Sequence, residues 1–226
     1  MSLASSISSI LSVRSIMMRS RASLDLTDAR AAQTRGISSF LGPVPEGVHI
    51  QNEAPDVRRF IPQGGGSMNY VYIHGGGLVH FGLDIFTPFL ANMVAKTGAR
   101  ITALGYDKAP EHEAGTCLEA LMRRRHAGTL DLGEVKLLGD SVGCLIALYP
   151  ALQIGSPAVS SVALIYPVLA LRDIYPSSEL FGEGYLLADT DMRHFRSLFG
   201  SWFLDQSLAS APEKRSTGEA GCAGVL

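Results

Sequence analysis

Cysteine, strong net charge and long apolar runs are all scarce in this chain, and each scarcity argues against a class of protein. Three cysteines among 226 residues, far apart in the sequence, are too few for a disulfide framework or a cysteine-ligated metal site. No run of 18 apolar residues occurs, so we expect no membrane span. The formal net charge of −2 gives no reason to expect nucleic acid as a partner. The few thiols predict a reducing compartment, and we expect a cytoplasmic protein.

Apolar residues and glycine are abundant instead. Hydrophobic residues make up 46% of the chain and glycine contributes 24 residues, which suits one α/β domain with many tight turns. The apolar pattern alternates between segments of strand and of helix, which predicts a mostly parallel sheet with helices on both faces. Strands are predicted near Val48–Asn52, Tyr70–Ile73, Arg100–Gly105, Val135–Leu138 and Ser161–Tyr166.

Three segments carry apolar residues at helical spacing. The first contains Ile85, Phe89 and Met93, and the second runs from Cys117 to Leu121. A last helix should be capped by Asp189 or Thr190 and extend to about residue 202. The first 23 residues are less clear, because nine serines, three arginines and no acid resemble a transit peptide, whereas the spacing of their apolar residues suits an amphipathic helix.

The most informative motif lies at residues 139–143, which read Gly-Asp-Ser-Val-Gly after an apolar strand and before a helical segment. A G-x-S-x-G pattern in that context is typical of a nucleophile elbow, in which the serine occupies a sharp strand-to-helix turn. Gly139 and Gly143 would allow strand and helix to pass closely. A surface serine in an ordinary loop is the alternative, and the motif alone does not exclude it.

A second motif lies 67 positions upstream, where His74-Gly75-Gly76-Gly77 follows the predicted strand Tyr70–Ile73. In acyl transfer the substrate carbonyl oxygen becomes an oxyanion, which backbone N–H groups stabilise. Glycines let the backbone approach closely enough to do so. We therefore predict an oxyanion hole made by the N–H groups of Gly75, Gly76 and Val142, the residue after the serine. A tight turn without catalytic meaning is the alternative.

The chain resembles the hormone-sensitive-lipase-like group of serine esterases in the α/β-hydrolase superfamily, which includes acetyl esterases. Besides the two glycine motifs, the segment Tyr106–His112 is similar to the family's Tyr-x-Leu-Ala-Pro-Glu-His, with Lys108 where leucine is usual, and Leu164–Pro167 is similar to the strand that follows the elbow helix. The resemblance covers about residues 29–204. It implies the α/β-hydrolase fold, an N-terminal helical cap over residues 1–40 and a core over residues 41–206.

The same resemblance implies an acetyl-esterase-like or lipase-like carboxylic ester hydrolase that acts on small acyl esters without a metal or other cofactor. Ser141 would be the nucleophile. Gly75, Gly76 and Val142 would stabilise the oxyanion. The supporting motif residues would be His74, Gly77, Gly139, Asp140 and Gly143, and the family's counterpart of His74 orders the oxyanion loop by hydrogen bonding.

The partners of the serine are harder to find. In this fold an acid and then a histidine follow the nucleophile in the sequence. His194 is the one histidine after Ser141, and it lies in a predicted helix where the family has no catalytic loop. His80 is close enough to the glycine motif to be tested as an unusual base. Acid and base segments of the family type are not recognisable, so we also consider an inactive hydrolase remnant, a binding module, or a chain completed by another subunit.

The C-terminal segment looks different from the rest. From about Ser207 the periodicity is lost, which predicts a disordered tail over residues 207–226 and suggests a C-terminally truncated member of the family. Truncation at that point would leave the predicted strand at Ser161–Tyr166 at an uncovered sheet edge. Because unpaired edges recruit other strands, we expect self-association through this segment.

Overall fold

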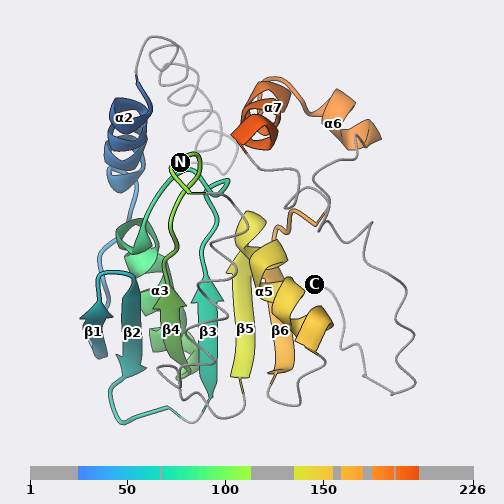
Figure 1. Cartoon of the computed structure of the whole chain (residues 1–226). Coiled ribbons are helices and arrows are strands. Elements are labelled where there is room, and N and C mark those ends of the chain that lie inside the picture. Colours follow the sequence, from blue (N-terminus) through green and yellow to red (C-terminus); the bar gives the residue numbers. More distant parts are fainter. Residues whose placement is uncertain are drawn as a thin grey trace.

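The computed structural model describes residues 25–66, 68–112, 135–154, 159–169, 175–185 and 187–198. These residues form an α/β fold around one sheet (Figure 1). In chain order the elements are α2 (Leu26–Ser38), β1 (Val48–Ala54), β2 (Val57–Pro62), β3 (Asn69–Ile73), α3 (Leu83–Thr97), β4 (Arg100–Leu104), β5 (Val135–Asp140), α5 (Val142–Ile154), β6 (Val159–Ile165), α6 (Pro176–Leu180) and α7 (Asp189–Leu198).

The sheet has the strand order β1-β2-β4-β3-β5-β6. Strands β4, β3, β5 and β6 pair in parallel, whereas β2 pairs antiparallel with both β1 and β4. The expected mostly parallel sheet is therefore confirmed, with an antiparallel hairpin at one end. Strand β6 is the last in this order, so among the described residues it occupies the predicted edge, and self-association through it stays a prediction.

Strand β2 was not expected from the sequence. Its two adjacent arginines, Arg58 and Arg59, interrupt the apolar pattern, and the burial that identifies it is limited to Val57 and Phe60. Pairing with β1 on one side and β4 on the other makes it a strand. A tertiary contact thus overrides a weak local signal here.

Helices cover both faces of the sheet, as predicted (Figure 1). Because successive side chains of a strand point to opposite faces, Val71 and Ile73 of β3 join the apolar cluster that contains residues of α5, whereas Tyr72 joins the cluster that contains residues of α3. Helices α2, α6 and α7 lie beyond the carboxyl ends of the parallel strands (Figure 1). None of the helices within the described ranges is long and apolar enough to cross a membrane.

One helix prediction changes in detail, and one short helix was not predicted. Helix α7 begins at Asp189 itself, so neither Asp189 nor Thr190 precedes it as a cap; instead Asp191 Oδ2 accepts a hydrogen bond from Ala188 N–H at 2.8 Å. The short helix α6 had no counterpart in the sequence analysis. The helix expected at residues 117–121, the segment 1–24 and the tail 207–226 lie outside the described residues. The domain boundaries at residues 40 and 206 stay predictions.

Candidate active site

Ser141 occupies the sharp turn between β5 and α5. Its φ angle is 53°, in the left-handed region that side chains other than glycine rarely adopt. The turn is held by the chain that follows β6: Ser141 N–H donates to Ile165 O at 3.0 Å, and Val168 N–H donates to Ser141 O at 3.1 Å. Two backbone hydrogen bonds therefore hold this residue in its strained conformation.

Gly139 and Gly143 bring strand and helix into backbone contact. A Cβ atom on Gly139 would lie 2.6 Å from Gly143 O, and one on Gly143 would lie 2.7 Å from His74 O and closer still to Ile73 O. Such distances are too short for any side chain. The expectation that both positions need glycine for close passage is thus confirmed by the geometry, and it links the elbow directly to the upstream glycine motif.

We call residues 74–80, which contain that motif, the glycine turn. Gly76 and Gly77 have φ angles of 108° and 64°, and Leu78 also has a positive φ of 59°. The N–H groups of Val79 and His80 both donate to Gly76 O, at 3.1 and 2.9 Å. The turn therefore curls back on itself immediately after β3, at the same end of the sheet as Ser141.

His74 orders the start of this turn. Its side chain is fully buried, and its ring stacks on Tyr106 at a centroid distance of 4.3 Å and on Phe86 at 5.2 Å. His74 Nδ1 lies 2.6 Å from Gly75 O, and Tyr106 OH donates to the backbone oxygens of His74 and Gly75. Burial lowers the pKa of His74 to about 4, so the ring is neutral near pH 7 and Nδ1–H donates the bond to Gly75 O.

Asp140 joins the elbow to the glycine turn. The residue is 4% exposed. Oδ1 of its carboxylate accepts hydrogen bonds from Tyr72 OH at 2.5 Å and Gly75 N–H at 2.7 Å, and Oδ2 accepts one from Tyr166 OH at 3.1 Å. Desolvation by burial raises the pKa of Asp140, and the three donors partly offset this rise. A Cβ atom on Gly75 would lie 2.9 Å from Ser141 Cβ, so the two motifs are in direct contact.

The N–H groups of the glycine turn differ in what they bind. The N–H of Gly75, expected from the sequence to face an oxyanion, is taken by Asp140. Within the described ranges, the N–H groups of Gly76 and Gly77 donate no hydrogen bond. Val142 N–H belongs to the first turn of α5, where helical N–H groups have no partner within the helix. Gly76, Gly77 and Val142 are therefore the donors left available near Ser141.

An apolar cavity of about 560 Å³ opens beside Ser141. Its walls come from the glycine turn, the elbow, α3, the chain after β6, α2 and α7. His80 lines it and is buried, whereas His194 is exposed on α7 and does not line it. Among the described residues, Ser141 Oγ has no hydrogen-bond partner. The residues that line it include Gln33, Ile37, Gly76, Gly77, His80, Ser141, Val142 and Phe195.

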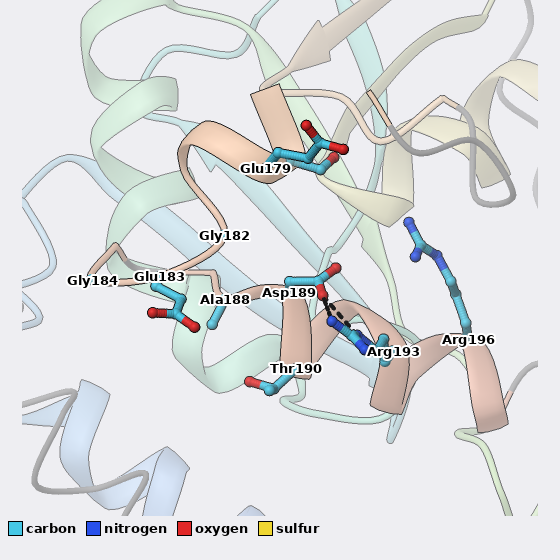
Figure 2. Close-up of a pocket in the computed structure, with 10 residues that line it drawn as sticks. Glu179, Gly182, Glu183, Gly184, Ala188, Asp189, Thr190, Arg193 and Arg196 are labelled. Carbon is cyan, nitrogen blue, oxygen red and sulfur yellow. Dashed lines mark hydrogen bonds and ion pairs between the residues drawn. The ribbon is translucent and has the colours of Figure 1, made fainter. Parts of the chain in front are cut away.

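A second cavity, of about 690 Å³, lies between α6 and α7, and most of the residues that line it carry polar or charged side chains (Figure 2). Glu179, Glu183 and Arg196 line it, and Arg193 turns toward Asp189, with which it forms an ion pair (Figure 2). None of the predicted site residues lines this cavity. Within the ranges that the structure describes, no cluster of three or more His, Cys, Asp or Glu side chains is placed to hold a metal ion.

Several residues that shape the site were not recognised in the sequence. Tyr72 and Tyr166 belong to segments read as plain strand, and their hydroxyl groups bind Asp140. Tyr106 opens the segment similar to the family's motif, which was a usable signal. Arg30, which contacts the glycine turn from α2, carried no signal at all. Cys144 is buried, and desolvation raises the pKa of its thiol to about 11, so it remains protonated.

Comparison with known proteins agrees with this fold. Residues 70–220 match the profile of the alpha/beta hydrolase fold family. The chain belongs to this family. Membership, predicted from the motifs, is thus confirmed, and the order of the two glycine motifs along this α/β hydrolase is the feature that made it recognisable. A crystal structure of ESTFA in its iron-lacking apo form covers 89% of this chain and 73% of its own, with a TM-score of 0.78 at 18% identity, which shows the shared fold.

Curated relatives of this α/β hydrolase include named ester hydrolases. The ethyl acetate hydrolase of Pseudomonas putida is 31% identical over 136 residues, which cover 55% of this chain and 43% of that protein. The acetyl esterase of Salmonella typhi is 27% identical over 150 residues, which cover 60% of this chain and 46% of that protein. The chain therefore spans less than half the length of either relative.

Proposed function

We propose that this chain carries the nucleophilic half of a carboxylic ester hydrolase that acts on small acyl esters. The observation that carries the proposal is the contact between two motifs: Ser141, strained at a positive φ, lies against a glycine turn with unused N–H groups, and both line one apolar cavity. The ethyl acetate hydrolase and acetyl esterase among the relatives support the same reaction class.

In this mechanism Ser141 Oγ attacks the ester carbonyl carbon, and the carbonyl oxygen becomes an oxyanion. The C–O bond to the alcohol then breaks, the alcohol leaves with a proton, and water hydrolyses the acyl-enzyme to release the acid. Because Gly75 N–H is bound to Asp140, we assign the oxyanion donors to Gly76, Gly77 and Val142. Loss of one such donor typically lowers the rate by a factor of roughly a hundred to a thousand.

The cavity favours an uncharged acyl group. Four aromatic side chains line it, from Phe81, Phe86, Tyr166 and Phe195, and none of the lysines and arginines within the described ranges does. Among the described residues that line it, Asp140 carries a carboxylate, which would repel an anionic substrate. A neutral ester of a short carboxylic acid therefore fits the cavity best, with no cofactor in the proposed reaction.

The mechanism also requires a base that accepts the proton of the Ser141 hydroxyl group. Within the described residues Ser141 Oγ has no partner, and His80 is the histidine that shares its cavity. His80 is therefore the first base to test. The missing hydrogen bond equally favours the second candidate function, a hydrolase fold that binds esters or other apolar ligands at this cavity without turnover.

A labelling experiment separates these functions. The purified chain is treated with a fluorophosphonate probe and with nitrophenyl acetate, beside Ser141→Ala and the control Ser39→Ala, which changes the exposed serine that follows the last residue of α2. Labelling and turnover that are lost in Ser141→Ala and kept in Ser39→Ala support the hydrolase. An unlabelled, inactive but folded chain supports the ligand-binding alternative. Loss of turnover in His80→Asn, with labelling of folded protein retained at a lower rate, would identify His80 as the base.

A further inference from the structure

One arginine of α2 bonds to two segments that support the candidate site. Arg30 Nε donates to Val79 O at 2.7 Å, in the glycine turn, and Arg30 Nη2 donates to Ala109 O at 2.6 Å. The guanidinium also makes a two-pronged contact with the Glu111 carboxylate, through Nη1 to Oε1 at 2.6 Å and Nη2 to Oε2 at 2.8 Å. We call these four hydrogen bonds the Arg30 clamp.

The two carbonyl bonds of the clamp matter more than its ion pair. Val79 and Ala109 are both fully buried. If Arg30 were removed, water could not easily replace the guanidinium as the hydrogen-bond donor to their carbonyl groups. Glu111 is half exposed, and exposed ion pairs contribute little to stability. Leu78 O also accepts a hydrogen bond from Ala109 N–H at 2.9 Å, so the two segments that Arg30 bonds are themselves joined.

The clamp acts on the part of the turn that fixes its glycines. Val79 O accepts from Arg30, and His80 N–H donates to Gly76 O. Val79 O and His80 N–H belong to one peptide group, which therefore lies between the arginine and the turn. On the same helix, Gln33 and Ile37 line the cavity. Helix α2 is therefore both a wall of the cavity and, through Arg30, a support of the glycine turn.

We propose that Arg30 is a positioning residue that docks α2 on the glycine turn and thereby holds the Gly76 and Gly77 N–H groups in donor geometry. The docking of α2 follows from the contacts alone. The effect on donor geometry rests on the proposed function. An acyl group that packs against Ile37 would, through the same helix, favour the conformation of the turn that stabilises the oxyanion.

Hydrogen exchange tests the docking without any need for activity. The exchange of peptides covering residues 26–38 and 76–82 is compared in the wild-type chain, Arg30→Ala, Glu111→Gln and the matched control Arg35→Ala, which removes an exposed arginine of the same helix. We expect exchange in both peptides to rise about tenfold to a hundredfold in Arg30→Ala, because two charge-assisted bonds to buried carbonyls are lost. Glu111→Gln should have a much smaller effect, and Arg35→Ala none.

Unchanged exchange of residues 76–82 in a folded Arg30→Ala protein would overturn the proposal, and so would equal effects of Arg30→Ala and Arg35→Ala. If Arg30→Ala does not fold, Arg30→Lys replaces it: a lysine keeps the charge, but its three donors lie on one nitrogen and cannot make the four hydrogen bonds of the guanidinium, so it should protect the turn less than arginine does. Full protection in Arg30→Lys would also count against the clamp.

Chemical rescue provides a readout that a general structural role would not give. Addition of a small alkylguanidinium ion to Arg30→Ala should restore part of the lost protection at residues 76–82, whereas an alkylammonium ion should not. If the wild-type chain is labelled by the fluorophosphonate probe, Arg30→Ala should lower kcat and the labelling rate about tenfold or more, and Ile37→Ala should mainly raise KM. An unlabelled wild type would refute the hydrolase but leave the exchange result decisive for the docking.

Discussion

The glycine turn and the α6–α7 segment both border the cavity beside Ser141, but they are held in different ways. The glycine turn is bonded by side chains that lie far away in the sequence, namely Arg30, Tyr106 and Asp140. The α6–α7 segment, residues 175–198, contains bonds between residues that are close in the sequence, such as Asp189 N–H to Gly182 O and the Asp189–Arg193 pair one helical turn apart.

This difference indicates which part of the site has the more firmly fixed backbone. Buried bonds between distant segments fix the backbone of the glycine turn and make it dependent on the whole fold. Because its local bonds are partly exposed, we expect the α6–α7 segment to open at a lower free-energy cost. Phe195 is the contact between the two regions: its ring packs over Gly77 and lies edge-on to His80 at a centroid distance of 5.8 Å.

The largest expected effect comes from a side chain added where the elbow meets the glycine turn. Gly143→Ala would place its methyl group against the backbone oxygens of Ile73 and His74, which have no room to move, and should destabilise the chain by about 3 kcal/mol. In Gly184→Ala, in the α6–α7 segment, the added methyl group meets no atom within 4 Å. Alanine is disfavoured at the φ of 80° found there, so the loss of stability should be about 1 kcal/mol. Urea unfolding of both variants measures the difference, and equal losses would contradict the comparison.

The second prediction concerns pH. The pKa of His74 is lowered from 6.5 to about 4 by burial, so the folded state binds the proton less tightly than the unfolded chain. The stability linked to His74 is fully present above about pH 6.5 and is lost as the pH falls toward 4. Between about pH 7 and pH 5 this loss should be about 2 kcal/mol.

Unfolding at these two pH values, in the wild type and in His74→Gln, isolates this contribution. The pH-dependent loss should shrink in His74→Gln and persist in His194→Gln, which changes the exposed histidine of α7. A wild type and a His74→Gln variant that lose stability in parallel would show that His74 is not the buried titrating group.

Phe195→Ala tests the contact between the two regions. Because the ring is half-buried, its removal should lower stability by about 1.5 kcal/mol, less than a fully buried phenylalanine would. Hydrogen exchange should accelerate across residues 189–198, while residues 74–80 keep their protection through the bonds to Arg30, Tyr106 and Asp140. Faster exchange of the glycine turn would show that it depends on α7 as well.

The smallest expected effect belongs to the surface pair of α7. Arg193→Ala removes an exposed ion pair with Asp189 at i,i+4 spacing and should cost about 0.3 kcal/mol, decreasing further at high salt. A thermal melt at low and high ionic strength measures it. A loss above about 1 kcal/mol would mean that the α6–α7 segment is held by more than local bonds.

The sequence predicted the elements that carry strong local patterns. The ends of strands β3, β4, β5 and β6 were predicted to within one or two residues. The glycines around Ser141 and those after His74 predicted the two tight turns. Strand β2 was missed because Arg58 and Arg59 conceal its period, and α6 because five residues give too little periodicity to detect. Helix α7 was found, but its capping residue was misassigned within one turn.

In the candidate site, too, some features could be predicted from local sequence patterns and others could not. Motif spacing was enough to predict that Ser141 and the glycines after His74 act together, but not which glycine N–H groups are free. That depends on Asp140, whose carboxylate takes Gly75 N–H once β3 and β5 pair in parallel. Likewise, Arg30 reaches the glycine turn across 49 residues of sequence. Spacing along the chain contains no information about either contact.

By itself, then, the sequence determined the α/β class, the family and the identity of the two motifs. The reason is that glycine positions and the spacing of apolar residues are local properties, which short stretches of the sequence contain in full. The tertiary structure decided which N–H groups remain available, how His74 is buried and which helix supports the turn. The physical reason is that hydrogen-bond satisfaction and desolvation depend on what surrounds a group in space, and distant segments supply those surroundings.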